Sequence, residues 1–154
     1  MKVNFGLSSN KVERVLEGLS QALADTYALY FMTLSGHWNY EGKEFISIHE
    51  MLEKQVETHS ETGDALAERI RLMGHKVPTS LKIFSDKATL RPFSEEAGRE
   101  EILQKLAEAN EACFISFRKL SKEAEAAGDD GLVDLLGGII RQLEVYAWKL
   151  RSEL

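Results

Sequence analysis

The sequence of 154 residues is poor in cysteine, in proline and in long hydrophobic runs. Cys113 is the only cysteine, which excludes an internal disulfide and a cysteine-based zinc site. Only Pro78 and Pro92 interrupt a composition rich in alanine, leucine, glutamate and lysine, which favours helix throughout. No apolar run approaches the ~20 residues of a membrane-spanning helix, and the first residues do not read as a signal peptide. We therefore expect a reduced, cytoplasmic protein with one domain over residues 1–154 and no membrane partner.

Positive charge is also in short supply. Lysine and arginine number 19 against 25 aspartates and glutamates, so the formal net charge is −6. Binding to phosphates needs clustered lysine and arginine, and the first ten residues contain a single lysine, Lys2. We therefore expect DNA binding to be weak or absent.

Hydrophobic periodicity predicts four long helices. Their expected ranges are 9–37, 43–73, 94–127 and 130–152. Residues 75–93 form a connector with room for one short helix near 82–88. Four long helices with one long crossover between the second and the third predict an all-α, ferritin-like four-helix bundle.

Local signals mark the expected helix ends. One of residues 8–10 can cap the first helix, and Ser94, followed by two glutamates, can open the third. Gly36 and Gly42 bracket a turn, and Gly74 stops the second helix. The expected apolar stripe of the second helix is Phe45, Ile48, Leu52, Val56, Ala67 and Ile70.

Five histidines and carboxylates recur at regular intervals in and before the second helix: His37, His49, Glu53, Asp64 and Glu68. Residues four apart share a helix face, so 49 and 53 form one convergent pair, and 64 and 68 form another. Both pairs lie on one face, because the eleven residues from Glu53 to Asp64 turn the helix through about 1,100°, which is only ~20° from three full turns. Their centres lie ~22 Å apart along the axis, so one ion cannot contact both pairs within a single chain.

A two-fold axis between two chains removes this difficulty. Positions 49 and 68 have the same midpoint, 58.5, as positions 53 and 64. If two copies of the second helix pack antiparallel about that point, each pair meets the other pair of the partner, and two identical sites form. His37, at the end of the first helix, can lie beside His49.

The residue types predict a metal at these sites. Imidazoles mixed with carboxylates, without a thiolate, suit iron, manganese or zinc. Five shared side chains should leave coordination positions open for water, oxygen or peroxide, which is typical of a redox site rather than a closed structural one.

The sequence resembles the Dps family, the mini-ferritins named as DNA-binding proteins from starved cells. The resemblance covers nearly the whole chain. It implies a subunit assembled as a hollow dodecamer, with two-fold interfaces that oxidise Fe(II), preferably with hydrogen peroxide, and a cavity that stores the ferric product. The matching residues are His37-Trp38-Asn39, Gly42, Phe45, His49-Glu50-Met51-Leu52, Asp64 and Ala67-Glu68-Arg69.

The resemblance also implies roles for single residues. One subunit would supply His37, His49 and Glu53, and its partner would supply Asp64 and Glu68. The family usually has an aspartate where this chain has Glu53, so the position of that carboxylate oxygen differs here.

Four further residues have candidate roles, and for Trp38, Asp129 and Asp130 there is a structural alternative. Trp38 follows a ligand position, so it can donate an electron and contain radicals, or it can simply pack at the dimer interface. Asp129, Asp130 and Asp134 match the region where the family lines its three-fold pores with acids, although Asp129 or Asp130 can also cap a helix.

The expected function is an enzyme that oxidises and stores iron, consumes peroxide or oxygen, and so limits oxidative damage. A protein that mainly compacts nucleoid DNA is the alternative from another class, and the acidic charge disfavours it. A zinc- or manganese-binding scaffold without turnover is a third interpretation, because the ligand set alone does not choose the metal.

Overall fold

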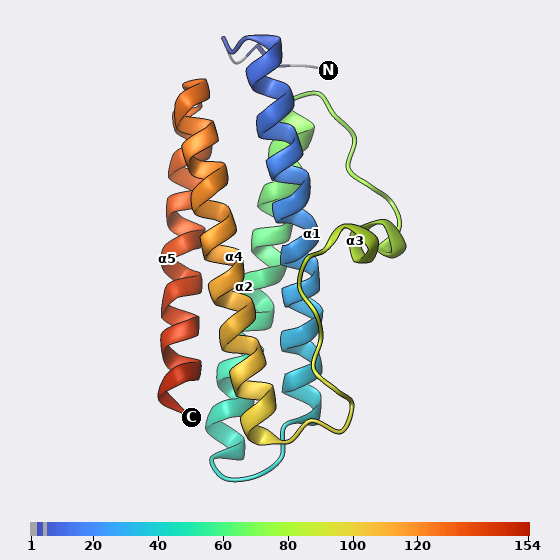
Figure 1. The fold of residues 1–154 in the computed structure, drawn as a ribbon, viewed down its shortest axis with the longest axis vertical. Helices are drawn as coiled ribbons and strands as arrows, with labels where there is room; N and C mark the ends of the chain where they lie inside the picture. The colour runs from blue at the N-terminus through green and yellow to red at the C-terminus, as the bar shows by residue number, and fades with distance from the viewer. Residues whose placement is uncertain (1–2, 5) are drawn as a thin grey trace.

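Five helices make up the chain in a computed structural model that describes residues 3, 4 and 6–154. They are α1 (Ser9–Asn39), α2 (Phe45–Leu72), α3 (Leu81–Lys87), α4 (Arg99–Ala127) and α5 (Asp130–Ser152). The four long helices lie alongside one another, and the short α3 lies on the outside of the bundle, next to α1 (Figure 1). No strand occurs in residues 3, 4 and 6–154. This is the expected four-helix bundle with a short extra helix in its long crossover.

None of the helices in the described part of the chain is both long enough and apolar enough to cross a membrane.

The core lies between the four long helices, and two glycines of α1 lie close against side chains of α4. A Cβ at Gly36 would lie 3.0 Å from Leu106 Cδ1 and 3.2 Å from Ile102 Cγ2 of α4. At the other end of α1, a Cβ at Gly18 would clash with Leu120 of α4. The sequence order of these contacts makes α1 and α4 antiparallel. The absence of side chains at these glycines is therefore what lets the two helices approach.

The turn after α1 lies later than the sequence predicted. Gly36 belongs to the helix, which continues to Asn39, and the turn instead contains Gly42 at φ +128° and Glu44 at φ 55°. Ser8 occupies the N-cap position of α1, but its hydroxyl makes no capping hydrogen bond.

The start of α4 also differs from the prediction. Ser94 caps a separate turn, in which its hydroxyl accepts a hydrogen bond from the Glu96 amide at 3.2 Å. The helix begins five residues later at Arg99, with Gly98 as its N-cap. The prediction was wrong here because a serine followed by acids starts a turn as readily as a helix. The predicted end of α4 at 127 and the predicted bounds of α5 at 130 and 152 are confirmed.

The buried face of α2 is partly polar, contrary to the predicted stripe. Phe45 is 42% exposed, and Val56 and Ala67 are only half-buried. Gln55 and His59 are buried in their place. The full set of buried residues on α2 is Ile48, Leu52, Gln55, His59, Gly63, Leu66 and Ile70.

Candidate metal centre

His37 and His49 lie side by side where α1 and α2 meet at the hairpin. Their ring centroids are 3.8 Å apart, and the rings are inclined by 23°. The Nδ1 atom of each ring lies 3.1 Å from the backbone carbonyl oxygen of the other residue. Because a carbonyl oxygen only accepts, each Nδ1 carries the hydrogen and donates. In the neutral rings both Nε2 atoms therefore keep a lone pair, which is the tautomer that a metal-binding imidazole requires.

Large apolar side chains are exposed on the same hairpin. Trp38 is 60% exposed and meets the edge of Phe31, which is equally exposed, at a centroid distance of 6.4 Å. Phe45 stacks on His49 at 5.1 Å, and Ile46 is 66% exposed. Single exposed apolar residues are ordinary, but a group of them beside polar ligands favours contact with another protein surface.

The three predicted carboxylates are exposed on α2. Glu53 follows His49 by one helical turn, whereas Asp64 and Glu68 lie 11 and 15 residues beyond Glu53. In the part of the chain that the structure describes, no group of three or more histidine, cysteine, aspartate and glutamate side chains could hold a metal ion. One chain thus brings His37 and His49 together but not the full set, and the metal-binding roles of all five residues stay a prediction.

The acids at the start of α5 differ in their surroundings. Asp129 is buried, caps α5 by accepting a hydrogen bond from the Leu132 amide at 3.1 Å, and forms an ion pair with Arg69 of α2. Asp130 and Asp134 are exposed. Asp129 is therefore engaged within its own subunit, and only Asp130 and Asp134 present their side chains to solvent.

The remaining histidines and the single thiol lie outside this site. His59 faces the interior of the bundle, where burial lowers its pKa to about 3, so the ring is neutral at physiological pH. His75 lies beyond the end of α2 and is exposed. Cys113 is buried as a free thiol, and burial, assisted by the negative charge of Asp25, raises its pKa.

Comparison with known proteins decides the family. The ferritin-like domain family matches residues 16–154. The chain is also 30% identical over 147 residues to a DNA protection during starvation protein of Porphyromonas gingivalis, covering 96% of this chain and 92% of the relative. The chain belongs to the Dps family of ferritin-like proteins.

Two further similarities extend over nearly the whole chain. An uncharacterized low temperature-induced protein of Nostoc is 31% identical over 153 residues, which span 98% of this chain and 86% of the relative. The crystal structure of a Dps protein from Vibrio cholerae superposes with a TM-score of 0.90 at 25% identity, covering 99% of this chain and 96% of that one. That protein is described as a member of a broad superfamily of ferritin-like diiron-carboxylate proteins. The predicted ferritin-like fold is thus confirmed.

Sequence reasoning about this Dps chain found the histidine pair but missed two features around it. The reciprocal hydrogen bonds of His37 and His49 depend on backbone carbonyls, which leave no trace in the residue pattern. The ion pair between Arg69 and Asp129 joins residues 60 positions apart. Arg69 follows Glu68 in a family-like motif, but nothing in the sequence identified its partner.

Proposed function

We propose that this protein oxidises Fe(II) with hydrogen peroxide or oxygen at sites shared between two subunits, and stores the ferric product within a homo-oligomeric shell. The observation that carries the proposal is the pair of His37 and His49. Their reciprocal hydrogen bonds through Nδ1 fix the tautomer in which each Nε2 keeps a lone pair that can bind a metal. The chain's similarity to a protein described as diiron-carboxylate supports iron as the substrate.

The shared site follows from the spacing on α2. An antiparallel partner copy of α2, centred between residues 58 and 59, would bring its Asp64 and Glu68 to His49 and Glu53 of the first subunit. The exposed apolar group on the hairpin supports a subunit contact at this place.

The donor types suit oxidation of iron. Carboxylates are hard donors, so Glu53, Asp64 and Glu68 would neutralise the ion and stabilise Fe(III) relative to Fe(II). In the reaction each of two Fe(II) ions loses one electron, and one hydrogen peroxide takes up both electrons and two protons to give two waters. Trp38, exposed beside His37, has no hard donor atom and would act on the fate of radicals or on packing.

The acids at the start of α5 would attract the cation. Asp130 and Asp134 lie one turn apart and are exposed, so they can line a negatively charged entry route if α5 contributes to a pore.

The experiment that tests the proposal is the initial rate of Fe(II) oxidation at a few irons per subunit, measured with anaerobic peroxide and, separately, in air. Asp64→Ala with Glu68→Ala should abolish the rapid phase while the bundle stays folded, because both side chains are exposed. Glu95→Ala with Glu96→Ala removes two exposed carboxylates away from α2 and is the matched control. Metal binding without any rapid oxidation in the wild type would instead identify a scaffold, and a wild-type rate in the α2 variant would contradict the site.

A further inference from the structure

A second group of polar side chains lies inside the bundle, apart from the surface site. Gln55 and His59 of α2 and Asn110 of α4 are 0%, 1% and 0% exposed. All three lie on the buried faces of their helices, and most of the other buried residues there are apolar. A polar side chain at such a position needs a hydrogen-bond partner inside the core.

The helix register brings these side chains to adjacent levels. Leu52 and Leu106 lie at one level, because a Cβ at Gly36 would be 3.7 Å from Leu52 Cδ1 and 3.0 Å from Leu106 Cδ1. Since α1 is antiparallel to both α2 and α4, the latter two helices run in the same direction (Figure 1). Gln55 and Asn110 follow these leucines by three and four residues, which is a rise of ~4.5–6 Å along each helix. Gln55 and Asn110 therefore lie at about the same level on two helices that face each other across the core without packing directly together, and His59 lies one turn further along α2.

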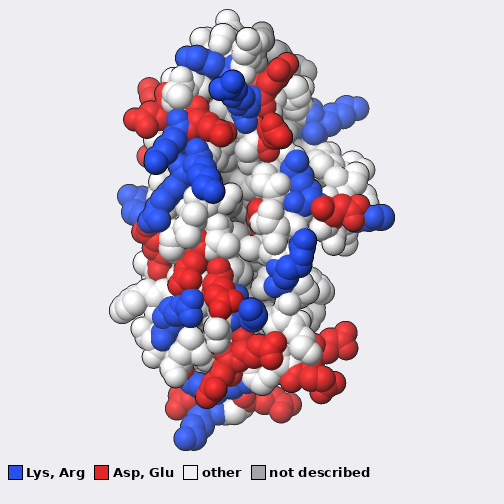
Figure 2. All heavy atoms as spheres, viewed as in Figure 1, with Lys and Arg blue, Asp and Glu red and all other residues white. Residues whose placement is uncertain are grey.

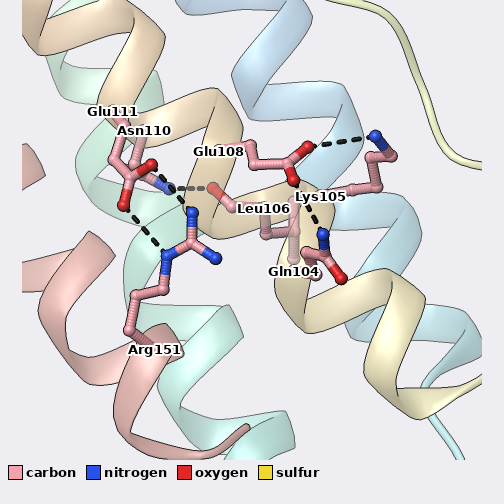
Figure 3. A network of polar contacts seen from close by, with 7 residues as sticks. All are labelled: Gln104, Lys105, Leu106, Glu108, Asn110, Glu111 and Arg151. Carbon is pink, nitrogen blue, oxygen red and sulfur yellow. Dashed lines mark hydrogen bonds and ion pairs between the residues drawn. The ribbon is translucent and has the colours of Figure 1, made fainter.

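Most of the polar atoms in this group have no partner within the protein. Gln55 Nε2, Gln55 Oε1, His59 Nε2 and Asn110 Oδ1 make no hydrogen bond to the residues that the structure describes. Asn110 Nδ2 donates to the Leu106 carbonyl oxygen at 2.8 Å, which leaves only the oxygen of this amide without a partner (Figure 3). A buried polar atom that stays without a hydrogen-bond partner destabilises the folded chain.

The tyrosine in contact with His59 makes no hydrogen bond to these atoms. Tyr146 of α5 meets the His59 ring at a centroid distance of 5.7 Å and an angle of 84°, which is an edge contact between rings. Its hydroxyl lies 2.6 Å from Thr58 Oγ1, so the polar end of this tyrosine already has a hydrogen-bond partner outside the group.

We propose that Gln55, Asn110 and His59 form an internal hydration site, in which bound water bridges the three side chains. Water fits because the unpartnered atoms include an amide donor and two amide acceptors, and a water molecule can both donate and accept. A metal ion fits poorly, because none of the three side chains is a carboxylate and a buried cation needs a compensating negative charge. Proteins contain about one buried water per ~27 residues, so a chain of this length has room for several.

This site is separate from the proposed iron site. Gln55 and Glu53 are two residues apart on α2, so they point ~160° away from each other. The two faces of α2 would then carry different chemistry: metal ligands outside and bound water inside.

A high-resolution crystal structure of the wild-type protein gives the direct test. We expect at least one water within ~2.7–3.2 Å of two or more of these side chains. Direct contact between the Gln55 and Asn110 amides with no water between them would overturn the proposal. So would a peak with metal-like distances of ~2.0–2.2 Å to these atoms.

Oxygen-17 magnetic relaxation dispersion, which counts long-lived internal waters, gives a test in solution. Gln55→Leu with Asn110→Leu should lower that count, whereas Gln104→Leu, which removes an exposed amide from α4, should leave it unchanged. An unchanged count in the double variant would overturn the proposal. If the double variant does not fold, the wild-type crystal structure decides alone.

Discussion

Burial lowers the pKa of His59 from 6.5 to about 3 in the folded chain, while the unfolded chain keeps the ordinary value. Below pH 6.5 the unfolded chain therefore binds a proton that the folded chain does not. Titration of this histidine therefore adds no pH dependence to stability above its unfolded pKa, and it lowers stability as the pH falls from 6.5 towards 3, by up to ~1.4 kcal/mol per pH unit.

We expect His59→Leu to remove this pH dependence. The free energy of unfolding of the variant relative to the wild type should rise by ~1–2 kcal/mol between pH 7 and pH 5, as measured by urea denaturation at each pH. His75→Leu, which removes an exposed histidine, is the control and should leave the wild-type pH profile in place. Parallel profiles for wild type and His59→Leu would contradict the prediction.

At the scale of helices, Asp129 connects the start of α5 to α2 through an ion pair. Its carboxylate caps α5 through the Leu132 amide and forms an ion pair with Arg69, and the two charged side chains are only 4% and 13% exposed. An exposed ion pair contributes little, whereas a pair taken out of water depends strongly on both partners being present.

We expect Asp129→Ala to lower the free energy of unfolding by ~3 kcal/mol or more, because it removes a helix cap and a partner of a buried cation. Asp130→Ala, one residue further on and exposed, should change stability by less than ~0.5 kcal/mol. Chemical denaturation of both variants measures the difference. Equal stability of the two would mean that the ion pair does not fasten these helices.

Other polar contacts join helices at the surface and carry less weight. Figure 3 shows Arg151 of α5 donating to both carboxylate oxygens of Glu111 on α4, at 2.9 and 3.0 Å. The two side chains are 40% and 34% exposed. Solvent screens such a pair, so its contribution is expected to lie within ~0–1 kcal/mol.

At the scale of the assembled molecule, a site shared by two chains can be restored by mixing. A His49→Ala chain and a Glu68→Ala chain each lack one proposed ligand at every site of their own dimers. In a mixed dimer, one of the two sites combines the intact His49 of one chain with the intact Glu68 of the other.

We therefore expect re-annealed mixtures to regain rapid Fe(II) oxidation, although neither variant has it alone. Subunit exchange is followed by mass spectrometry of differently labelled chains, and the unmixed variants are the control. No recovery of rate after proven exchange would contradict a site between subunits.

Charge decides the expected behaviour towards DNA. The formal net charge is −6, and on the face drawn in Figure 2 acidic side chains flank the lysines and arginines. We expect no stable complex with duplex DNA in a gel-shift assay at neutral pH and low salt without divalent ions. A tight complex that weakens steeply with added salt would contradict this expectation, in spite of the family's name.

The sequence alone determined the features that depend on neighbouring residues. Helical periodicity and the break at Gly128 predicted the C-terminal end of α4 and both ends of α5, because a hydrophobic repeat and a left-handed glycine act over a few positions. The same local geometry predicted that His49 and Glu53 would lie one turn apart and that His37 could reach His49. The roles of these residues as iron ligands remain a prediction.

Tertiary structure decided what depends on residues far apart along the chain. Gly36 predicted a turn by its residue type, but Leu106 and Ile102 of α4 make it a packing glycine within α1. The hydrogen bonds that orient His37 and His49 go to backbone carbonyl oxygens on the other side of the hairpin. Arg69 pairs with Asp129, which lies 60 positions further along the chain. Gln55 and His59 are polar residues that a stripe of apolar letters does not include, yet the packing of four helices encloses them. Burial and long-range pairing are properties of the packed bundle, so no local pattern could have predicted them.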